Sequence, residues 1–243
     1  MLKPVPAGTA LLERLAAEPQ LAGLFLDFDG VLAPIVERPD DAQAPAETRR
    51  ELERLAARYA LVAVVSGRAG DDVRRRVGVD GVSAVGSHGL ELDPASEAWR
   101  DRIDAFAGDA GWPDTERKGL AVSFHYRTAE DERAALEALE DLAARARAYG
   151  LVARFGRKVL EVLPPVGSNK GTAVRSLLAG ADLERALVAG DDTTDLDAFR
   201  AVEDLPHRVR IAVLAPESPR LLADYAELVV ETTQEFLDVL RHL

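Results

Sequence analysis

Short apolar runs alternate with amphipathic segments in residues 1–93 and 165–243 of this 243-residue chain, and this alternation limits the possible folds more than any other feature. Apolar strands separated by helices form a parallel sheet that is covered on both faces. The predicted strands are 24–27, 61–65, 82–85, 186–189, 209–214 and 227–230, and the predicted helices are 45–59, one that ends near 77, 172–178, 194–202, 219–225 and 234–240.

Residues 94–164 follow a different pattern. Residues 120–127 alternate strictly between large apolar side chains and small or polar ones, as in a strand with one buried and one open face. Thr128 has the character of an N-cap for a helix that ends before Gly150. Two further strands, 151–155 and 158–162, lie on either side of a hairpin turn at Gly156-Arg157.

These two patterns predict a two-domain α/β protein. Residues 1–93 and 165–243 would form a Rossmann-like parallel-sheet core. Residues 94–164 would form an inserted α+β cap domain, with Pro164-Pro165 marking the return to the core.

The composition excludes several classes of function. A net charge of -12 argues against nucleic acid as a partner, because phosphate backbones bind to Lys/Arg surfaces. The absence of cysteine excludes disulfides, thiolate catalysis and cysteine-ligated metal centres. The N-terminus has no signal-peptide pattern, and no apolar run is long enough to cross a membrane. We therefore expect a cytoplasmic protein without membrane partners, and a monomer.

The strongest chemical signal is Asp27-Phe28-Asp29-Gly30, directly after the first apolar run. Open α/β sheets bind ligands at the carboxyl ends of their strands. Two carboxylates about 4 Å apart repel each other by roughly 4 kcal/mol at an effective dielectric near 20, so Asp27 and Asp29 need a cation or a shared proton. Oxygen ligands, scattered histidines and no cysteine favour Mg²⁺ over zinc. The alternative is a solvated loop with incidental acids.

A second acidic cluster, Asp191, Asp192 and Asp195, follows the apolar run 186–189. N-capping of the next helix could explain one or two of these residues, but not the whole group. An acidic strand end in each half of the core predicts one metal site built from both halves.

Two further positions could bind an anion. Ser66 follows the strand 61–65, and Lys170 stands at the beginning of a helix, where its charge opposes the helix dipole. A cation and a helix N-terminus together favour a phosphoryl group. The alternatives are a turn or cap residue at Ser66 and an exposed surface lysine at position 170.

The ordered set DxDG, Ser, Lys and GDDxxD resembles the haloacid dehalogenase superfamily of phosphotransferases. Three further segments narrow the resemblance to the trehalose-6-phosphate phosphatase family. They are Gly86-Ser87-His88-Gly89-Leu90-Glu91, the strand that ends in His125-Tyr126-Arg127, and Glu161 followed by Pro164 and Lys170-Gly171.

The resemblance implies roles for the core residues. Asp27 would be the nucleophile and Asp29 the general acid and base, while Ser66 and Lys170 would bind the transferring phosphoryl group. Asp27, the backbone carbonyl of Asp29, and Asp191 would hold Mg²⁺, with Asp192 or Asp195 in support.

The resemblance also implies a set of substrate-binding residues. Some of them have a simple structural alternative: a bend between glycines for His88, and a solvent-facing strand surface for His125 and Arg127. The implied set is Gly67, Arg68, His88, His125, Arg127, Arg157 and Glu161.

The implied activity is a Mg²⁺-dependent phosphatase that converts trehalose 6-phosphate to trehalose and phosphate through an aspartyl-phosphate on Asp27. The alternatives are a phosphatase for a related sugar phosphate or glycosyl phosphoglycerate, and a hexose phosphate phosphotransferase or mutase. A non-catalytic protein, either a phosphoryl-accepting signalling receiver or a degenerate binding domain, is disfavoured, because a receiver needs no inserted domain and every chemical position is filled here.

Overall fold

The structure is a computed structural model that describes residues 6–36, 38–156, 158–215 and 218–243. The chain divides into two compact units. The larger unit comprises Met1–Gly89 and Ser168–Leu243, and the smaller unit comprises Leu90–Gly167. The sequence placed the divisions after residues 93 and 164.

The larger unit contains a six-stranded parallel sheet in the order β10-β9-β8-β1-β2-β3. β1 is therefore flanked by β2 on one side and by β8 on the other, and the strand order reverses direction between β1 and β8. The strands are β1 (Ala22–Leu26), β2 (Leu61–Val65), β3 (Val82–Val85), β8 (Arg185–Gly190), β9 (His207–Val213) and β10 (Leu228–Val230).

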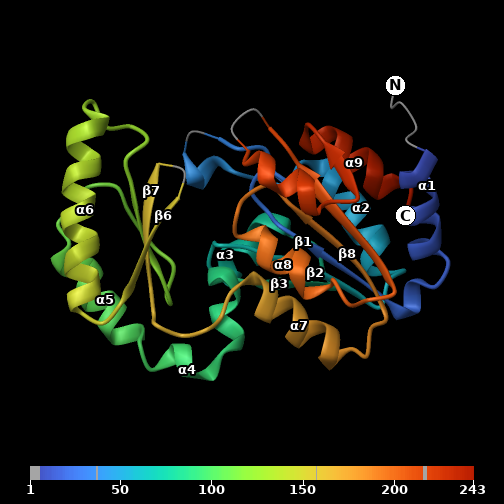
Figure 1. Ribbon diagram of the computed structural model, residues 1–243, viewed down its shortest axis with the longest axis horizontal. Coiled ribbons are helices and arrows are strands. Elements are labelled where there is room, and N and C mark those ends of the chain that lie inside the picture. Colours follow the sequence, from blue (N-terminus) through green and yellow to red (C-terminus); the bar gives the residue numbers. More distant parts are fainter. Residues whose placement is uncertain (1–5, 37, 157, 216–217) are drawn as a thin grey trace. The chain divides into compact units, whose positions relative to one another are not determined.

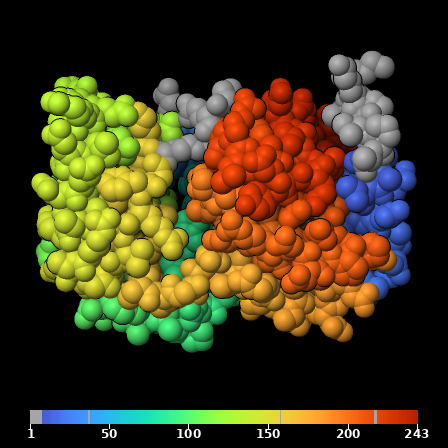
Figure 2. Space-filling view, in the orientation of Figure 1, coloured from blue at the N-terminus to red at the C-terminus, as the bar shows by residue number. Residues whose placement is uncertain are grey.

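Helices cover both faces of this sheet (Figure 1). On one face, apolar side chains from α1 (Pro6–Ala16), α2 (Ala46–Ala56), α3 (Gly70–Val77) and α9 (Thr233–Arg241) pack against the strands. On the other face, α7 (Lys170–Gly180), α8 (Asp195–Ala201) and the 3₁₀ turn η4 (Arg220–Tyr225) do the same. In the space-filling view, the segments from β9 onward form one continuous patch of this unit's surface (Figure 2).

The smaller unit is an antiparallel sheet with helices packed on one face (Figure 1). The strand order is β4-β5-β7-β6. Phe106 of α5 packs edge-on against Phe124 of β5, with ring centroids 6.2 Å apart. The elements are α4 (Pro94–Glu97), α5 (Arg100–Asp109), β4 (Thr115–Arg117), β5 (Val122–His125), α6 (Glu132–Ala148), β6 (Val152–Gly156) and β7 (Val159–Leu163).

These observations confirm the predicted fold class, a parallel-sheet core with an inserted α+β unit. β2 and β3 have the predicted bounds, and most other elements differ from prediction by a few residues at their ends. α1, α4 and β4 were not predicted. Within the described ranges, no helix is long and apolar enough to cross a bilayer.

Three local predictions are wrong. The helix expected at 219–225 is a 3₁₀ turn preceded by Pro219. Asp131, not Thr128, caps α6, because its Oδ1 accepts the backbone N–H of Ala134 at 3.0 Å. The face of β5 expected to be open is buried at Ser123, where the neighbouring strands place Glu116 and Glu161 directly opposite.

Candidate active site

The candidate site lies at the carboxyl edge of the larger unit's sheet, where the strand order reverses. In open α/β sheets, this switch point leaves a crevice outside the carboxyl ends of the strands, and ligands bind there. Asp27 follows β1 and Asp191 follows β8, the two strands that flank the reversal. The backbone N–H of Asp27 donates to the carbonyl of Ala189 at 3.0 Å, which ties the two strand ends together.

Lys170 is the cation of this site. It is the first residue of α7, and its side chain is only 3% exposed. Its Nζ lies 2.8 Å from Asp27 Oδ2 and 2.7 Å from Asp195 Oδ1. Lys170 is therefore a buried ion-pair partner of the predicted nucleophile, and the alternative of an exposed surface lysine is wrong.

Asp195 organises the loop after β8. Its Oδ2 accepts the backbone N–H groups of Asp191 and Asp192, both at 3.0 Å, while its Oδ1 accepts Lys170. The Asp195 carboxylate leaves no room for a side chain at Gly190, because a Cβ there would lie 2.2 Å from Asp195 Cγ. Asp195 therefore holds both the acidic loop and the lysine.

Glycine is also required at position 30. Gly30 has a φ of +79°, which disfavours other residues, and a Cβ there would lie 2.4 Å from Asp191 Oδ2. The loop after β1 thus packs directly against the acid that follows β8.

The ionisation of this cluster follows from its burial. Burial raises the pKa of Asp27 well above its ordinary value, and the carboxylates of Asp195 and Asp191 raise it further, while Lys170 opposes the shift. Burial lowers the pKa of Lys170, but Asp195 and Asp27 outweigh this effect and raise it. Lys170 is accordingly an ammonium at neutral pH, and the cluster holds excess acid around one cation.

The residues present fit a divalent ion. Asp27, Asp191 and Asp195 are all buried, and each offers a carboxylate oxygen within 4.8 Å of the others. Three carboxyl groups face one ammonium group, and all the side-chain donors are oxygens, which suits Mg²⁺. Among the described residues, the side chains of Asp29 and Asp192 stand outside this group. Asp192 Oδ1 instead accepts the backbone N–H of Thr193 at 2.6 Å.

Ser66 and its neighbours form a loop after β2. The Ser66 side chain is fully buried, and its Oγ accepts the backbone N–H of Arg68 at 3.2 Å. His88 donates its backbone N–H to the Ser66 carbonyl at 2.9 Å, and a Cβ on Gly67 would lie 2.7 Å from the His88 ring. Ser87 and His88 both have positive φ angles, 50° and 55°. This strained turn directs the His88 ring onto Gly67.

Asp29 does not share the environment of Asp27. Arg68 donates to both of its carboxyl oxygens, from Nε to Oδ2 at 2.7 Å and from Nη2 to Oδ1 at 2.9 Å. The two acids of the DxD motif therefore have different cations, Lys170 for Asp27 and Arg68 for Asp29, which relieves the repulsion expected from the sequence.

The smaller unit carries a row of polar side chains across its sheet. Glu116, Ser123 and Glu161 lie directly opposite one another on three adjacent strands. Lys118 Nζ lies 3.2 Å from Glu161 Oε1 and 3.6 Å from Glu116 Oε2. His125 Nε2 lies 2.9 Å from Glu116 Oε2.

Part of this row could be predicted from the sequence. Glu161 and His125 were predicted, whereas Glu116 and Lys118 were missed, because the short strand β4 contains no apolar residue that would mark it. Arg127 is exposed just after β5. Arg157, which the resemblance also implied, lies outside the described residues.

Comparison with known proteins identifies the family of this chain. A family model described as trehalose-phosphatase matches residues 25–107 and 114–228. The chain belongs to this family. The match spans both acidic strand ends, Ser66 and Lys170, and it includes the polar row of the smaller unit.

Two relatives show the range of proteins in which such chains occur. A trehalose-phosphate phosphatase of Mycobacterium avium is 33% identical over 247 residues, which cover 86% of this chain and 62% of that protein. A protein of Mycobacterium tuberculosis named as an uncharacterized glycosyl hydrolase is 39% identical over 207 residues, covering 74% of this chain and 15% of that protein. This chain thus spans less than two thirds of either relative.

Solved structures share the architecture. A trehalose-6-phosphate phosphatase related protein matches with a TM-score of 0.73 and 27% identity, covering 90% of this chain and 95% of that one. The C-terminal domain of the Candida albicans trehalose-6-phosphate phosphatase matches with a TM-score of 0.74 and 22% identity over 96% of this chain and 94% of that one. The second likeness concerns the fold alone.

Proposed function

We propose that this chain is a Mg²⁺-dependent phosphatase that hydrolyses a sugar phosphate, with trehalose 6-phosphate as the first candidate, through an aspartyl-phosphate on Asp27. The observation that supports it most is the buried contact of Lys170 with both Asp27 and Asp195 at the switch point. Membership of the trehalose-phosphatase family and the names of its relatives support the choice of substrate.

In the first step, an Asp27 carboxylate oxygen attacks phosphorus, and the bond from phosphorus to the sugar oxygen breaks. Phosphoryl transfer depends mainly on positioning and charge neutralisation. The Lys170 ammonium neutralises phosphoryl oxygens beside Asp27, and Ser66 hydrogen bonds to them. Asp29, protonated on the oxygen that Arg68 releases, gives this proton to the departing sugar oxygen.

In the second step, water attacks the aspartyl-phosphate. Asp29, now a carboxylate, takes a proton from this water, and the bond from phosphorus to Asp27 breaks to release phosphate. The enzyme returns to its starting state.

The acidic cluster would hold the metal through Asp27 and Asp191, together with the backbone carbonyl of Asp29 as the resemblance implies. Asp195 supports the cluster through Lys170 and the backbone N–H groups of the loop. A bound Mg²⁺ supplies positive charge to phosphate oxygens and favours the ionised form of Asp27.

The polar row of the smaller unit supports recognition of a sugar. Glu116 and Glu161 offer acceptors, and Lys118, 3.6 and 3.2 Å from them, offers donors; sugar hydroxyl groups need both. We assign sugar recognition to this row, which includes His125.

A phosphate-release panel tests the proposal. Purified protein is assayed with trehalose 6-phosphate, other hexose phosphates, glycosyl phosphoglycerates and an aryl phosphate, with Mg²⁺ and with EDTA. We expect Mg²⁺-dependent release that is fastest with trehalose 6-phosphate. Release from none of these substrates would refute the function, and transfer of labelled phosphate back to a sugar would identify a phosphotransferase or mutase instead.

A further inference from the structure

Arg68 is a buried arginine whose guanidinium group binds both carboxyl oxygens of Asp29. Its side chain is 7% exposed, whereas that of Asp29 is 34% exposed. The two N–H···O bonds, at 2.7 and 2.9 Å, have the bidentate geometry that fixes a carboxylate in orientation as well as in position. The sequence had suggested that Arg68 binds substrate.

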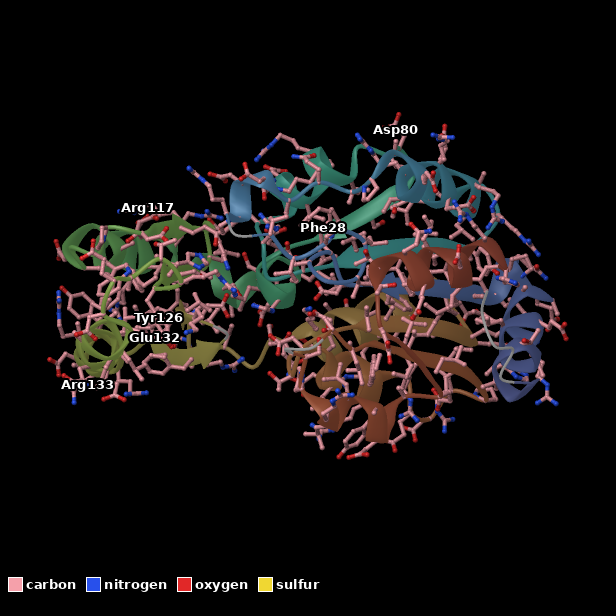
Figure 3. The ribbon with its side chains drawn as sticks, turned by 90° about the horizontal axis from the view of Figure 1, so that it is seen from above. Phe28, Asp80, Arg117, Tyr126, Glu132 and Arg133 are labelled. Atoms are coloured by element: carbon pink, nitrogen blue, oxygen red, sulfur yellow. The ribbon has the colours of Figure 1, made fainter. Side chains whose placement is uncertain are left out.

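The guanidinium is held from several sides besides Asp29. Its Nη2 also donates to the carbonyl of Pro39 at 2.9 Å, and its Nη1 donates to Asp72 Oδ2 at 3.3 Å. Its Cζ lies 5.6 Å from the centre of the Phe28 ring, which is within range of a cation–π contact. Phe28 itself lies inside the larger unit (Figure 3).

The contacts continue away from the site. Asp72 Oδ2 also accepts Arg76 Nε at 2.6 Å, and Arg76 Nη1 donates to the carbonyls of Asp40 and Ala42 at 2.8 and 2.7 Å. Arg76 is buried like Arg68. Helix α3 and the segment 39–42 therefore anchor the guanidinium that holds Asp29.

We propose that Arg68 is a positioning residue that fixes the Asp29 carboxyl for proton transfer and does not itself bind the phosphoryl group. This inference rests on the proposed function, in which Asp29 serves the leaving oxygen and the attacking water. Because Arg68 is also bonded to Pro39 and Asp72, the guanidinium keeps its place when one of its two bonds to Asp29 opens. One Asp29 oxygen can then reach the leaving group while the other stays anchored.

This role predicts a dependence on the leaving group. A sugar alkoxide is a poor leaving group and needs the proton from Asp29 as the bond from phosphorus breaks. A nitrophenolate leaves without that proton. Loss of positioning should therefore slow hydrolysis of a sugar phosphate far more than hydrolysis of p-nitrophenyl phosphate.

The test compares kcat/KM for the two substrates in Arg68→Met. This ratio of constants reports only steps up to formation of the aspartyl-phosphate, so the later use of Asp29 as a base does not enter it. We expect kcat/KM for the sugar phosphate to fall on the order of 10- to 100-fold, with a loss of about threefold or less for the aryl phosphate. In Arg68→Lys, whose ammonium group cannot bridge both Asp29 oxygens, kcat/KM for the sugar phosphate should lie between the values of the wild type and Arg68→Met.

Arg210→Met is the matched control. It removes another largely buried arginine whose guanidinium binds a carboxylate, with Arg210 Nη2 2.6 Å from Glu227 Oε1, but this pair joins β9 to the segment before β10. Its ratio of sugar to aryl kcat/KM should stay within about twofold of the wild type, on the usual scale for residues outside a coupled unit.

A double-mutant cycle identifies the route of the effect. If Arg68 acts only through Asp29, then Arg68→Met should change kcat/KM for the sugar phosphate little in an Asp29→Asn background. Equal losses for both substrates, additive effects in the cycle, or faster hydrolysis of the sugar phosphate would each overturn the inference. Failure of the wild type to release phosphate from either substrate would instead refute the proposed function.

Discussion

The two units use charge in different ways. In the larger unit, Asp27, Lys170 and Asp195 are buried together at the ends of parallel strands. In the smaller unit, the charged groups lie across an antiparallel sheet whose opposite face packs on α5 and α6. A buried cluster suits group transfer, because electrostatic interactions are stronger where bulk water is excluded. A row on a sheet face suits recognition, since it offers many moderate hydrogen bonds.

The sharpest way to break this comparison is Asp27→Asn. Removing the nucleophile should lower phosphate release on the order of 10⁴-fold or more with sugar and aryl phosphates alike. The control is Asp80→Asn, an exposed acid of the same unit (Figure 3). More than about a tenth of wild-type turnover in pure Asp27→Asn protein would reject the nucleophile.

Lys170→Met tests whether the larger unit depends on its buried charges. The substitution leaves Asp27 and Asp195 buried without their cation, and breaking a buried pair in this way costs about 3–5 kcal/mol. We expect the free energy of unfolding, measured with urea at pH 7 in EDTA, to fall by that amount. Lys158→Met in the smaller unit is the control.

Lys158 is suited to this comparison because it pairs with Glu132 near the protein surface and lies over the Tyr126 ring. Figure 3 labels Glu132 and Tyr126 in the smaller unit. Exposed pairs contribute about 0–1 kcal/mol. Equal destabilisation by the two substitutions would remove the distinction between the units.

Lys118→Met tests the division of labour between transfer and recognition. Loss of a charged donor to a sugar hydroxyl costs about 1.5–3 kcal/mol. We therefore expect kcat/KM for trehalose 6-phosphate to fall on the order of 10- to 100-fold, mainly through KM. Hydrolysis of p-nitrophenyl phosphate should be unchanged. Equal losses with both substrates would mean that Lys118 supports the fold or the transfer step.

The same contrast separates what the sequence could predict from what it could not. Parallel strands are short apolar runs, so their ends, and with them Asp27, Ser66 and Asp191, could be placed at one edge of the sheet from the sequence. Lys170 could be placed at a helix start, although its burial could not. The smaller unit was harder, because β4 consists of Thr115, Glu116 and Arg117 and has no apolar pattern.

Side-chain partners were the least predictable feature. Arg68 and Asp29 are 39 positions apart, and nothing in their spacing shows that one holds the other. The resemblance implied only that Arg68 belongs to the substrate-binding set. The packing of α3 and the 39–42 segment around the guanidinium favours the positioning role instead.

The smallest expected effect concerns Asp72, the acid between Arg68 and Arg76. Burial raises the pKa of Asp72, but hydrogen bonds and charge from Arg76 and Arg68 outweigh it, so this pKa is lowered from its ordinary value of 3.8. A carboxyl whose pKa is lowered on folding stabilises the protein above its unfolded pKa, and this contribution is lost as the pH falls through the folded value. Asp72→Asn should therefore lower the free energy of unfolding by about 1 kcal/mol at pH 7.

That difference should shrink toward zero as urea titrations are repeated at pH values below 3.8, as far as the fold persists. Asp71→Asn is the control, since the Asp71 side chain is 82% exposed and, among the described residues, pairs with Arg74 at the surface. Asp71→Asn should change the free energy of unfolding little, both at pH 7 and below pH 3.8. A constant Asp72→Asn penalty across the titration would show that its contacts act by shape and not by charge, and the anchoring of Arg68 would then not depend on the Asp72 carboxylate.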